Sequence, residues 1–218
     1  MIRIYFDYIS PYSYLAWVKL AEIAARHRRA IEPVPILFAA ILDARGARGP
    51  AEEPARRRYL IKDLLRRAHD LGVPLELPPA HPFNPLLPLR LTSLPMPADT
   101  RHALVDHLFA ATWAGGGGIT DRKLVGRIAH EVGLPEGALA EAETPENKAR
   151  LKAATDEAIA AGAFGVPTMI ADGEMFFGSD SLPHLDRFLA GGDPVDQDIV
   201  ERWLTLPAAS QRPQATRT

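Results

Sequence analysis

The stretch IYFDYISPYSYLAW, residues 4–17, decides the fold of the N-terminal region. Apolar and polar side chains alternate over residues 2–8, which is typical of a β-strand. Ser10 is a residue type that favours the N-cap of a helix, and Pro11 suits the first helical position. Apolar residues at helical spacing then continue to about Arg28. We therefore predict a strand followed immediately by a helix.

A second extended segment, IEPVPILF, follows at residues 31–38. Pro33 and Pro35 lack the backbone N–H that a central strand donates, so we expect this segment at the edge of a sheet. Together with the strand and helix before it, the segment completes a strand–helix–strand unit.

The next 120 residues have the character of a helical block. Helical spacing and helix start and stop signals mark residues 56–72, 97–113, 121–133 and 144–161. One apolar stripe in the first of these consists of Leu60, Ile61, Leu64, Leu65, Ala68 and Leu71. The proline-rich residues 78–91 are expected to be irregular.

Extended structure returns in GVPTMIADGEMFFG, residues 165–178. Asp172-Gly173 is a favoured two-residue hairpin turn, so we predict a short antiparallel strand on each side of it. A closing helix is expected from Leu182 to Ala190. Residues 207–218 have the composition of a disordered tail.

This order of elements predicts an α/β protein with a thioredoxin-like fold. Residues 1–40 and 162–205 would form the thioredoxin-like domain, which places the strand–helix–strand half first and the strand–strand–helix half last. Residues 41–161 would form a large all-helical insertion between the two halves.

The composition excludes several classes of function. The net charge of −2, from 25 basic and 27 acidic residues, gives no global attraction to nucleic acid or to an anionic membrane. No apolar run reaches the roughly 20 residues of a membrane span, and the start of the chain lacks the pattern of a secretory signal, so we expect a cytoplasmic protein. The chain has no cysteine, and His102 and His107 are not spaced for one helix face, so we predict no metal site.

Four motifs together resemble one enzyme family. FDYISPYS at residues 6–13, HPFNPLLPLR at 81–90, GVPT at 165–168 and FGSD at 177–180 occur in the order and spacing of 2-hydroxychromene-2-carboxylate isomerases. That family is similar to kappa-class glutathione transferases and belongs to the disulfide-oxidoreductase branch of thioredoxin folds. The resemblance covers about residues 1–190, and it implies glutathione as cofactor, a small aromatic substrate and a homodimer.

The resemblance also implies roles for particular residues. In the family, the serine of the S-P-x-S turn faces the sulfur of glutathione. The residue before the proline of G-V-P-T pairs its backbone with the tripeptide, next to a cis peptide bond, and the G-x-D segment holds the γ-glutamyl end. Carried over, these positions are Ser10, Val166, and Ser179 with Asp180. The family often has an arginine after this aspartate, where Ser181 stands in this chain.

Three further positions are candidates for ligand contacts. Arg56 is the nearest match to a family lysine that meets the glycyl carboxylate of glutathione, with Arg57 as the alternative. Asn84 matches the F-x-N segment beside the second-substrate pocket, and Tyr12 flanks the turn where it could wall an aromatic site. Each also has a plainer explanation: a solvated charge for the arginines, a turn former for Asn84 and local packing for Tyr12.

Ser10 could be only an N-cap, but its position also suits the stabilisation of a thiolate. A thiol with a pKa of about 8.5 is only a few per cent ionised at pH 7, and lowering that pKa by two units requires roughly 2.7 kcal/mol. A helix N-terminus supplies up to about 2 kcal/mol, and a hydrogen bond to the charged sulfur supplies about 1.5–3 kcal/mol. The two together suffice. A nucleophilic serine is the rival chemistry, but the chain has no G-x-S-x-G motif and no histidine that local sequence places as its base.

The leading interpretation is therefore a glutathione-dependent cis–trans isomerase that acts on an aromatic-degradation intermediate. The family reaction interconverts 2-hydroxychromene-2-carboxylate and trans-o-hydroxybenzylidenepyruvate. Two alternatives stay open at this point: a kappa-type glutathione S-transferase with the same residues, and a thioredoxin-like binding module without chemistry.

Overall fold

The computed structural model describes residues 1–207. Apart from its first residue, the tail predicted at residues 207–218 lies outside the described residues. Within the described range, no helix is both long and apolar enough to cross a membrane.

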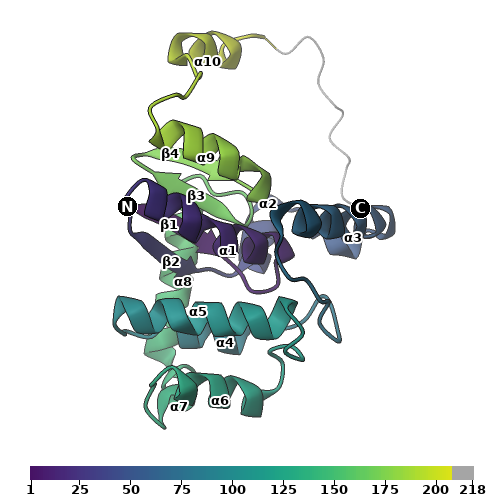
Figure 1. The fold of residues 1–218 in the computed structure, drawn as a ribbon, viewed down its shortest axis with the longest axis vertical. Helices are drawn as coiled ribbons and strands as arrows, with labels where there is room; N and C mark the ends of the chain where they lie inside the picture. Colours follow the sequence, from purple (N-terminus) through teal and green to yellow (C-terminus); the bar gives the residue numbers. More distant parts are fainter. Residues whose placement is uncertain (208–218) are drawn as a thin grey trace.

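A four-stranded sheet with the order β2-β1-β3-β4 forms the centre of the molecule (Figure 1). β1 (Ile2–Phe6) pairs in parallel with β2 (Ile31–Pro35) and antiparallel with β3 (Thr168–Ala171). β4 (Glu174–Phe177) pairs antiparallel with β3. The two halves predicted at opposite ends of the chain thus share one sheet.

Two local predictions about the strands are confirmed. β2 is an edge strand, and Pro33 and Pro35 lie within it opposite residues of β1. The β3–β4 turn is the predicted Asp172-Gly173, whose φ angles are 50° and 89°. Positive φ at both central positions is the geometry that favours aspartate and glycine in two-residue hairpins.

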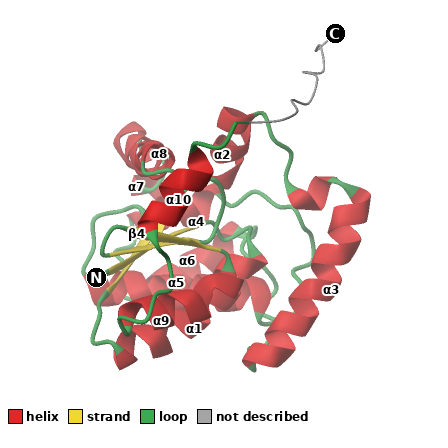
Figure 2. Cartoon of the chain, turned by 90° about the horizontal axis from the view of Figure 1, so that it is seen from above, coloured by secondary structure: helices red, strands yellow, loops and turns green. Residues whose placement is uncertain are grey.

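Helices cover both faces of the sheet (Figure 2). On one face, α1 (Pro11–Arg26), α5 (Ala98–Trp113) and α9 (Leu182–Leu189) pack over the sheet. Ile2 and Ile4, which alternate along β1, belong to the large buried cluster on this side. Burial of this apolar surface is the main stabilising contribution to the domain.

The opposite face is covered by α2 (Phe38–Arg45) and α8 (Pro145–Ala160). Tyr5, which lies between the inward residues of the first face, belongs to the smaller buried cluster here. α8 is tied to the chain after β2 because the Leu37 N–H donates to the Thr155 hydroxyl at 3.0 Å. The last helix before β3 therefore packs directly on the sheet.

The other helices between α2 and α8 are η1 (Pro50–Glu52), α3 (Pro54–Leu71), α4 (Leu86–Thr92), α6 (Arg122–Glu131) and α7 (Ala138–Glu141). α4 corrects the expectation of an irregular segment at residues 78–91. Pro85 is its N-cap and Pro88 lies in its first turn, where backbone N–H groups have no intrahelical partner, so the prolines remove no helical hydrogen bond.

The apolar stripe predicted on α3 is only partly a core stripe. Leu64 and Ala68 are buried, but Leu65 is 53% exposed. α3 projects beyond the sheet at one side of the molecule (Figure 1), so part of its surface has no element to pack against. α1 ends at Arg26, two residues before the predicted end, because the chain turns at Arg28 with a φ angle of 53°.

The last described helix, α10 (Gln197–Leu204), stands apart from the sheet and its covering helices (Figure 1). None of its residues is buried.

Candidate active site

A cavity of about 500 Å³ lies where β1 ends and α1 begins. Its walls come from residues 7, 9–12, 37–39, 42, 48–52, 60, 63, 67, 81–83, 85, 164–166, 177, 178 and 180. A volume of this size is typical of a small-molecule site, and the cavity is formed at the junction of the sheet and the helical segments.

Ser10 lies in this cavity as the N-cap of α1. Its Oγ accepts a hydrogen bond from the Ser13 N–H at 3.2 Å and donates to the Val166 carbonyl oxygen at 3.5 Å. The hydroxyl is thus held at the positive end of the α1 dipole, beside the backbone that precedes β3. An anionic atom placed here would meet both a hydroxyl donor and the helix N-terminus.

Val166 also lines the cavity, and its peptide bond to Pro167 is cis, as the resemblance implied. In the described part of the chain, its N–H makes no backbone hydrogen bond, and its carbonyl oxygen accepts only from Ser10. An extended peptide could pair with these groups in the manner of an added strand.

Tyr12 belongs to a polar network that lines the same cavity. The Tyr12 hydroxyl donates to Asp63 Oδ2 at 2.7 Å, and Arg67 Nε donates to the same oxygen at 2.6 Å. Arg67 Nη1 lies 3.4 Å from Asp180 Oδ1, and its guanidinium lies 5.6 Å from the centre of the Tyr12 ring. The network links α1, α3 and the segment after β4.

The network fixes the charges of its members. Burial and the hydrogen bond to Asp63 both raise the pKa of the Tyr12 phenol, so this hydroxyl stays protonated. Burial alone would raise the pKa of Asp63, but the hydrogen bonds from Tyr12 and Arg67 hold it below its ordinary value. The wall therefore presents a neutral phenol, a carboxylate and a guanidinium in fixed positions.

Asp7 is a cavity residue to which the sequence analysis assigned no role. It is buried, and its carboxylate accepts from the N–H groups of Ile9 and Phe38, both at 3.0 Å. Burial raises the pKa of Asp7 to about 7, and these two hydrogen bonds oppose the rise. The sequence feature that could have identified Asp7 is its position at the end of the first strand, three residues before Ser10.

His81 is a second residue that the sequence analysis did not single out. Its Nε2 lies 3.0 Å from the Ile9 carbonyl oxygen, and its ring packs against Trp113 with the ring centres 5.5 Å apart. Burial lowers the pKa of His81, so the imidazole is neutral at neutral pH. Because a carbonyl only accepts, Nε2 carries the proton and Nδ1 keeps its lone pair. Prolines flank the Ala80-His81 pair, so the sequence pattern indicated a turn and gave no reason to assign His81 a role.

Three residues expected at the site do not line the cavity. The side chain of Arg56 is 66% exposed and forms an ion pair with Glu53, one helical turn away. Asn84 is exposed, and its Oδ1 accepts from the Leu86 N–H, so it acts as a turn former before α4. Ser179 is buried, and its hydroxyl has no hydrogen-bond partner in the described structure.

Arg48 and Arg67 are cations that line the cavity, whereas Arg56 does not. The sequence analysis singled out neither of the two as a candidate for the carboxylate contact. Arg48 is exposed on the rim, before η1, and forms no ion pair within residues 1–207. Arg57 contacts the site indirectly, by donating to the His81 carbonyl oxygen at 3.2 Å. No group of three or more histidine and acidic side chains in the described range could hold a metal ion.

Comparison with known proteins agrees with this geometry. Residues 1–190 match the family described as a DSBA-like thioredoxin domain. A 2-hydroxychromene-2-carboxylate isomerase of Sphingobium xenophagum is 32% identical over 191 residues, which cover 86% of this chain and 97% of that protein. Glutathione S-transferase kappa 1 of Homo sapiens is 27% identical over 208 residues, which cover 86% of this chain and 90% of that protein.

A solved structure of a 2-hydroxychromene-2-carboxylate isomerase has the same fold. It superimposes with a TM-score of 0.81 at 25% identity and covers 94% of this chain and 99% of that one. The predicted fold class, a thioredoxin-like fold with a large helical insertion, is thereby confirmed. The chain therefore belongs to the DsbA-like thioredoxin-domain family, among relatives that include 2-hydroxychromene-2-carboxylate isomerases and kappa-class glutathione S-transferases.

Proposed function

We propose that this protein is a glutathione-dependent cis–trans isomerase of an aromatic-degradation intermediate, of the type that converts 2-hydroxychromene-2-carboxylate to trans-o-hydroxybenzylidenepyruvate. The observation that carries the proposal is the position of the Ser10 hydroxyl, at the N-terminus of α1 and beside the Val166 backbone within one cavity. The isomerase relatives, at 30–32% identity over most of the chain, support the same reaction class.

The residues of the cavity fit glutathione. Val166 offers an N–H without a backbone partner in the described structure, which suits the peptide of the ligand. Asp180, at the start of the segment after β4, can accept from the γ-glutamyl ammonium. We propose Arg48 in place of Arg56 as the cation for the glycyl carboxylate, since it lies on the rim and has no ion pair among residues 1–207.

When bound, glutathione supplies a thiolate that adds reversibly to a conjugated carbon of the substrate and so turns a double bond into a rotatable single bond. Ser10 has the task of stabilising negative charge before and after that chemistry, by its O–H and its position at the helix N-terminus. Tyr12 is held by Asp63 and presents its ring to the cavity, where it can wall the aromatic substrate. Pro82, Phe83 and Pro85 add apolar surface that excludes water.

A kappa-type glutathione S-transferase is the second candidate, favoured by relatives of that name at 27–28% identity. The two functions differ in the fate of the adduct. Incubation with glutathione and 2-hydroxychromene-2-carboxylate, followed by mass spectrometry of the product, separates them: an isomerase returns product of unchanged mass, and a transferase returns product that retains glutathione.

The binding of glutathione itself is tested by calorimetry on the full chain. Saturable heat at millimolar ligand or below is expected. A flat titration would contradict the cofactor proposal and favour a binding module without this chemistry. The remaining parts of the proposal are a cytoplasmic location, which rests on the sequence, and a homodimer, which rests on the resemblance to the family.

A further inference from the structure

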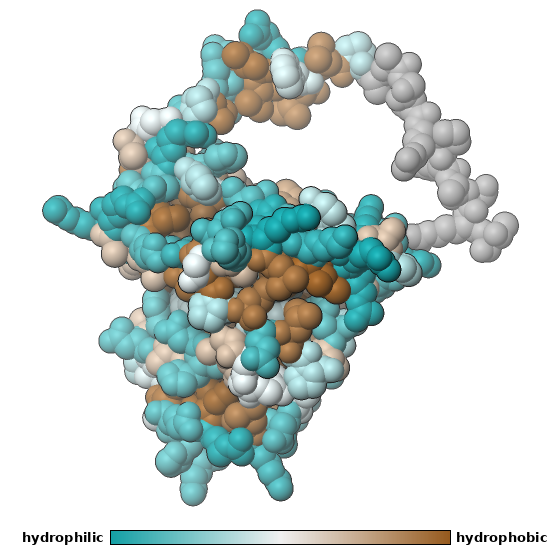
Figure 3. All heavy atoms as spheres, turned by 45° about the vertical axis from the view of Figure 1, so that its right-hand side comes forward, coloured by the Kyte–Doolittle hydropathy of each residue, from teal (hydrophilic) through white to brown (hydrophobic). Residues whose placement is uncertain are grey.

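α10 lines neither cavity, and it follows residue 190, where the match to the DSBA-like thioredoxin domain ends. The apolar side chains of α10 lie along one face of the helix and continue just past its end. Trp203, Leu204 and Leu206 are 74%, 73% and 68% exposed, and Ile199 and Val200 are also exposed. Figure 3 shows hydrophobic surface on the detached helix at the top of the molecule.

A helix of this kind requires a partner. Eight residues are too few to form a stable helix alone in water, because the cost of nucleation outweighs a few hydrogen bonds. Amphipathic helices are stabilised instead by the surface that covers their apolar face. Since none of the residues of α10 is buried, the described chain does not supply that cover.

The net charge of residues 191–206 restricts the kind of surface that can bind α10. Residues 191–206 contain four acidic residues, Asp193, Asp196, Asp198 and Glu201, against the single base Arg202. An acidic helix with an apolar face is repelled by anionic lipid and by nucleic acid. The complementary surface is a groove with an apolar floor and a basic rim.

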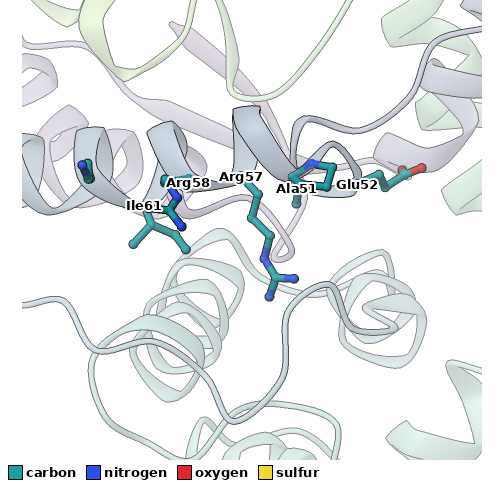
Figure 4. Close-up of a pocket in the computed structure, with 7 residues that line it drawn as sticks. Ala51, Glu52, Arg57, Arg58 and Ile61 are labelled. Atoms are coloured by element: carbon teal, nitrogen blue, oxygen red, sulfur yellow. The ribbon is translucent and has the colours of Figure 1, made fainter.

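The chain carries such a groove on α3. A second cavity of about 440 Å³ is lined by Ala51, Pro54 and Ile61, together with Glu52 and the three cations Arg57, Arg58 and Lys62. Figure 4 shows the Arg57 and Ile61 side chains extending from the same side of the helix, with Glu52 at the opposite end of the group from Ile61. Leu65, one turn beyond Ile61, is exposed and continues the apolar strip. α3 as a whole has six basic residues and two acidic ones.

From this complementarity we infer that α10 docks in the α3 groove of a second copy of this chain. The Trp203 indole fills the apolar floor, where the cations of the rim can also interact with its ring. Asp198 and Glu201 lie near Arg58 and Lys62. Each copy has one such helix and one such groove, so two copies related by a twofold axis exchange helices and satisfy both contacts.

The position of α10 favours a second copy over the groove of its own chain. The segment after β4 touches α3 where Asp180 contacts Arg67, and α9 then carries the chain about 12 Å away from that point (Figure 1). The groove lies nine residues earlier on α3, about 14 Å from Arg67 along the helix axis. The link of residues 190–196 spans at most about 25 Å when fully extended. Docking within one chain would therefore require residues 190–196 to span nearly their fully extended length.

The test measures association of the full chain by sedimentation equilibrium across a range of concentrations. Wild type should form a dimer. The rim variant, Arg58→Glu with Lys62→Glu, and the helix variant, Asp198→Lys with Glu201→Lys, should each raise the dissociation constant on the order of tenfold or more, because like charges then face each other. Trp203→Ala should also weaken the dimer. The matched control, Lys123→Glu with Arg127→Glu, reverses two exposed cations on α6 and should leave association unchanged.

Charge complementation makes the test specific to this contact. The chain that carries all four reversals should regain the dimer, and an equimolar mixture of the rim variant and the helix variant should form heterodimers. A wild-type protein that stays monomeric, including one whose α10 folds onto its own α3, would overturn the inference. So would a dimer that both reversals leave intact. None of these results depends on glutathione, so the outcome is separable from that of the proposed function.

Discussion

The Ser10 hydroxyl lies 3.5 Å from the Val166 carbonyl oxygen, although 156 residues separate the two positions in the sequence. This contact joins the N-terminal half of the fold to the C-terminal half at the cavity. It brings together the hydroxyl expected to stabilise a thiolate and the backbone expected to bind a peptide.

Ser10→Ala is expected to reduce turnover by roughly tenfold to a hundredfold and to raise the pKa of the bound glutathione thiol by about one to two units, because one hydrogen bond to a charged sulfur is lost. Thiolate absorbance as a function of pH measures that shift directly. Loss of the N-cap should also reduce the free energy of unfolding by about 1 kcal/mol. Ser10→Thr keeps a hydroxyl and is the control, and equal turnover in all three proteins would contradict the assigned role.

Arg48→Ala is expected to raise the dissociation constant of glutathione roughly threefold to tenfold, since a rim cation is partly screened by water. Arg56→Ala is the matched variant on the solvent side and should change the constant little. Calorimetry on both variants decides between the two arginines. A larger effect at Arg56 would restore the original interpretation from the sequence.

Arg67→Met is expected to weaken glutathione binding severalfold while the unfolding midpoint changes little. The guanidinium orders Asp63 and Asp180, but its ion pairs are partly exposed and contribute at most about 1 kcal/mol to stability. Arg66→Met removes the neighbouring exposed cation as a control. If both variants bound glutathione like wild type, the network would have no part in the site.

Asp7 should make stability depend on pH. Its pKa in the folded protein is about 7, above the ordinary value of 3.8, so the folded state binds the proton more tightly than the unfolded state. The protonated form is therefore favoured on folding, and its contribution to stability falls as the pH rises from about 4 to about 7, by an amount on the order of a few kcal/mol.

Denaturant unfolding of wild type and Asp7→Asn over that pH range measures this effect. The difference in free energy of unfolding, wild type minus variant, should fall between about pH 4 and pH 7 and level off above it. The absolute value will also reflect the carboxylate oxygen that the amide nitrogen replaces, so the slope is the informative quantity. Asp70→Asn, on an exposed face of α3, is the matched control for the substitution itself.

Local patterns in the sequence predicted most of the fold because the forces behind them are local. The cap at Ser10, the edge strand with Pro33 and Pro35 and the turn at Asp172-Gly173 each depend on a few adjacent residues. One exception was α4, where prolines in the first turn looked like helix breakers.

The sequence predicted a residue of the cavity only where that residue belongs to a recognisable motif. Ser10, Val166 and Asp180 lie on the cavity as expected. Arg56 does not, because α3 extends past the sheet and its first turn faces solvent. Asp63 and Arg67 meet Tyr12 and Asp180 only through tertiary packing, which no spacing along the chain reveals.

The absence of sulfur from the Ser10–Ser13 turn has a consequence for oxidative stress. A dithiol at such a turn would be converted by peroxide to a disulfide or a sulfenic acid and would need a reductase to recover. Two hydroxyls undergo neither reaction. If the proposed chemistry holds, the rate in the cell would follow the supply of reduced tripeptide, and the protein would resume work as soon as that supply returned.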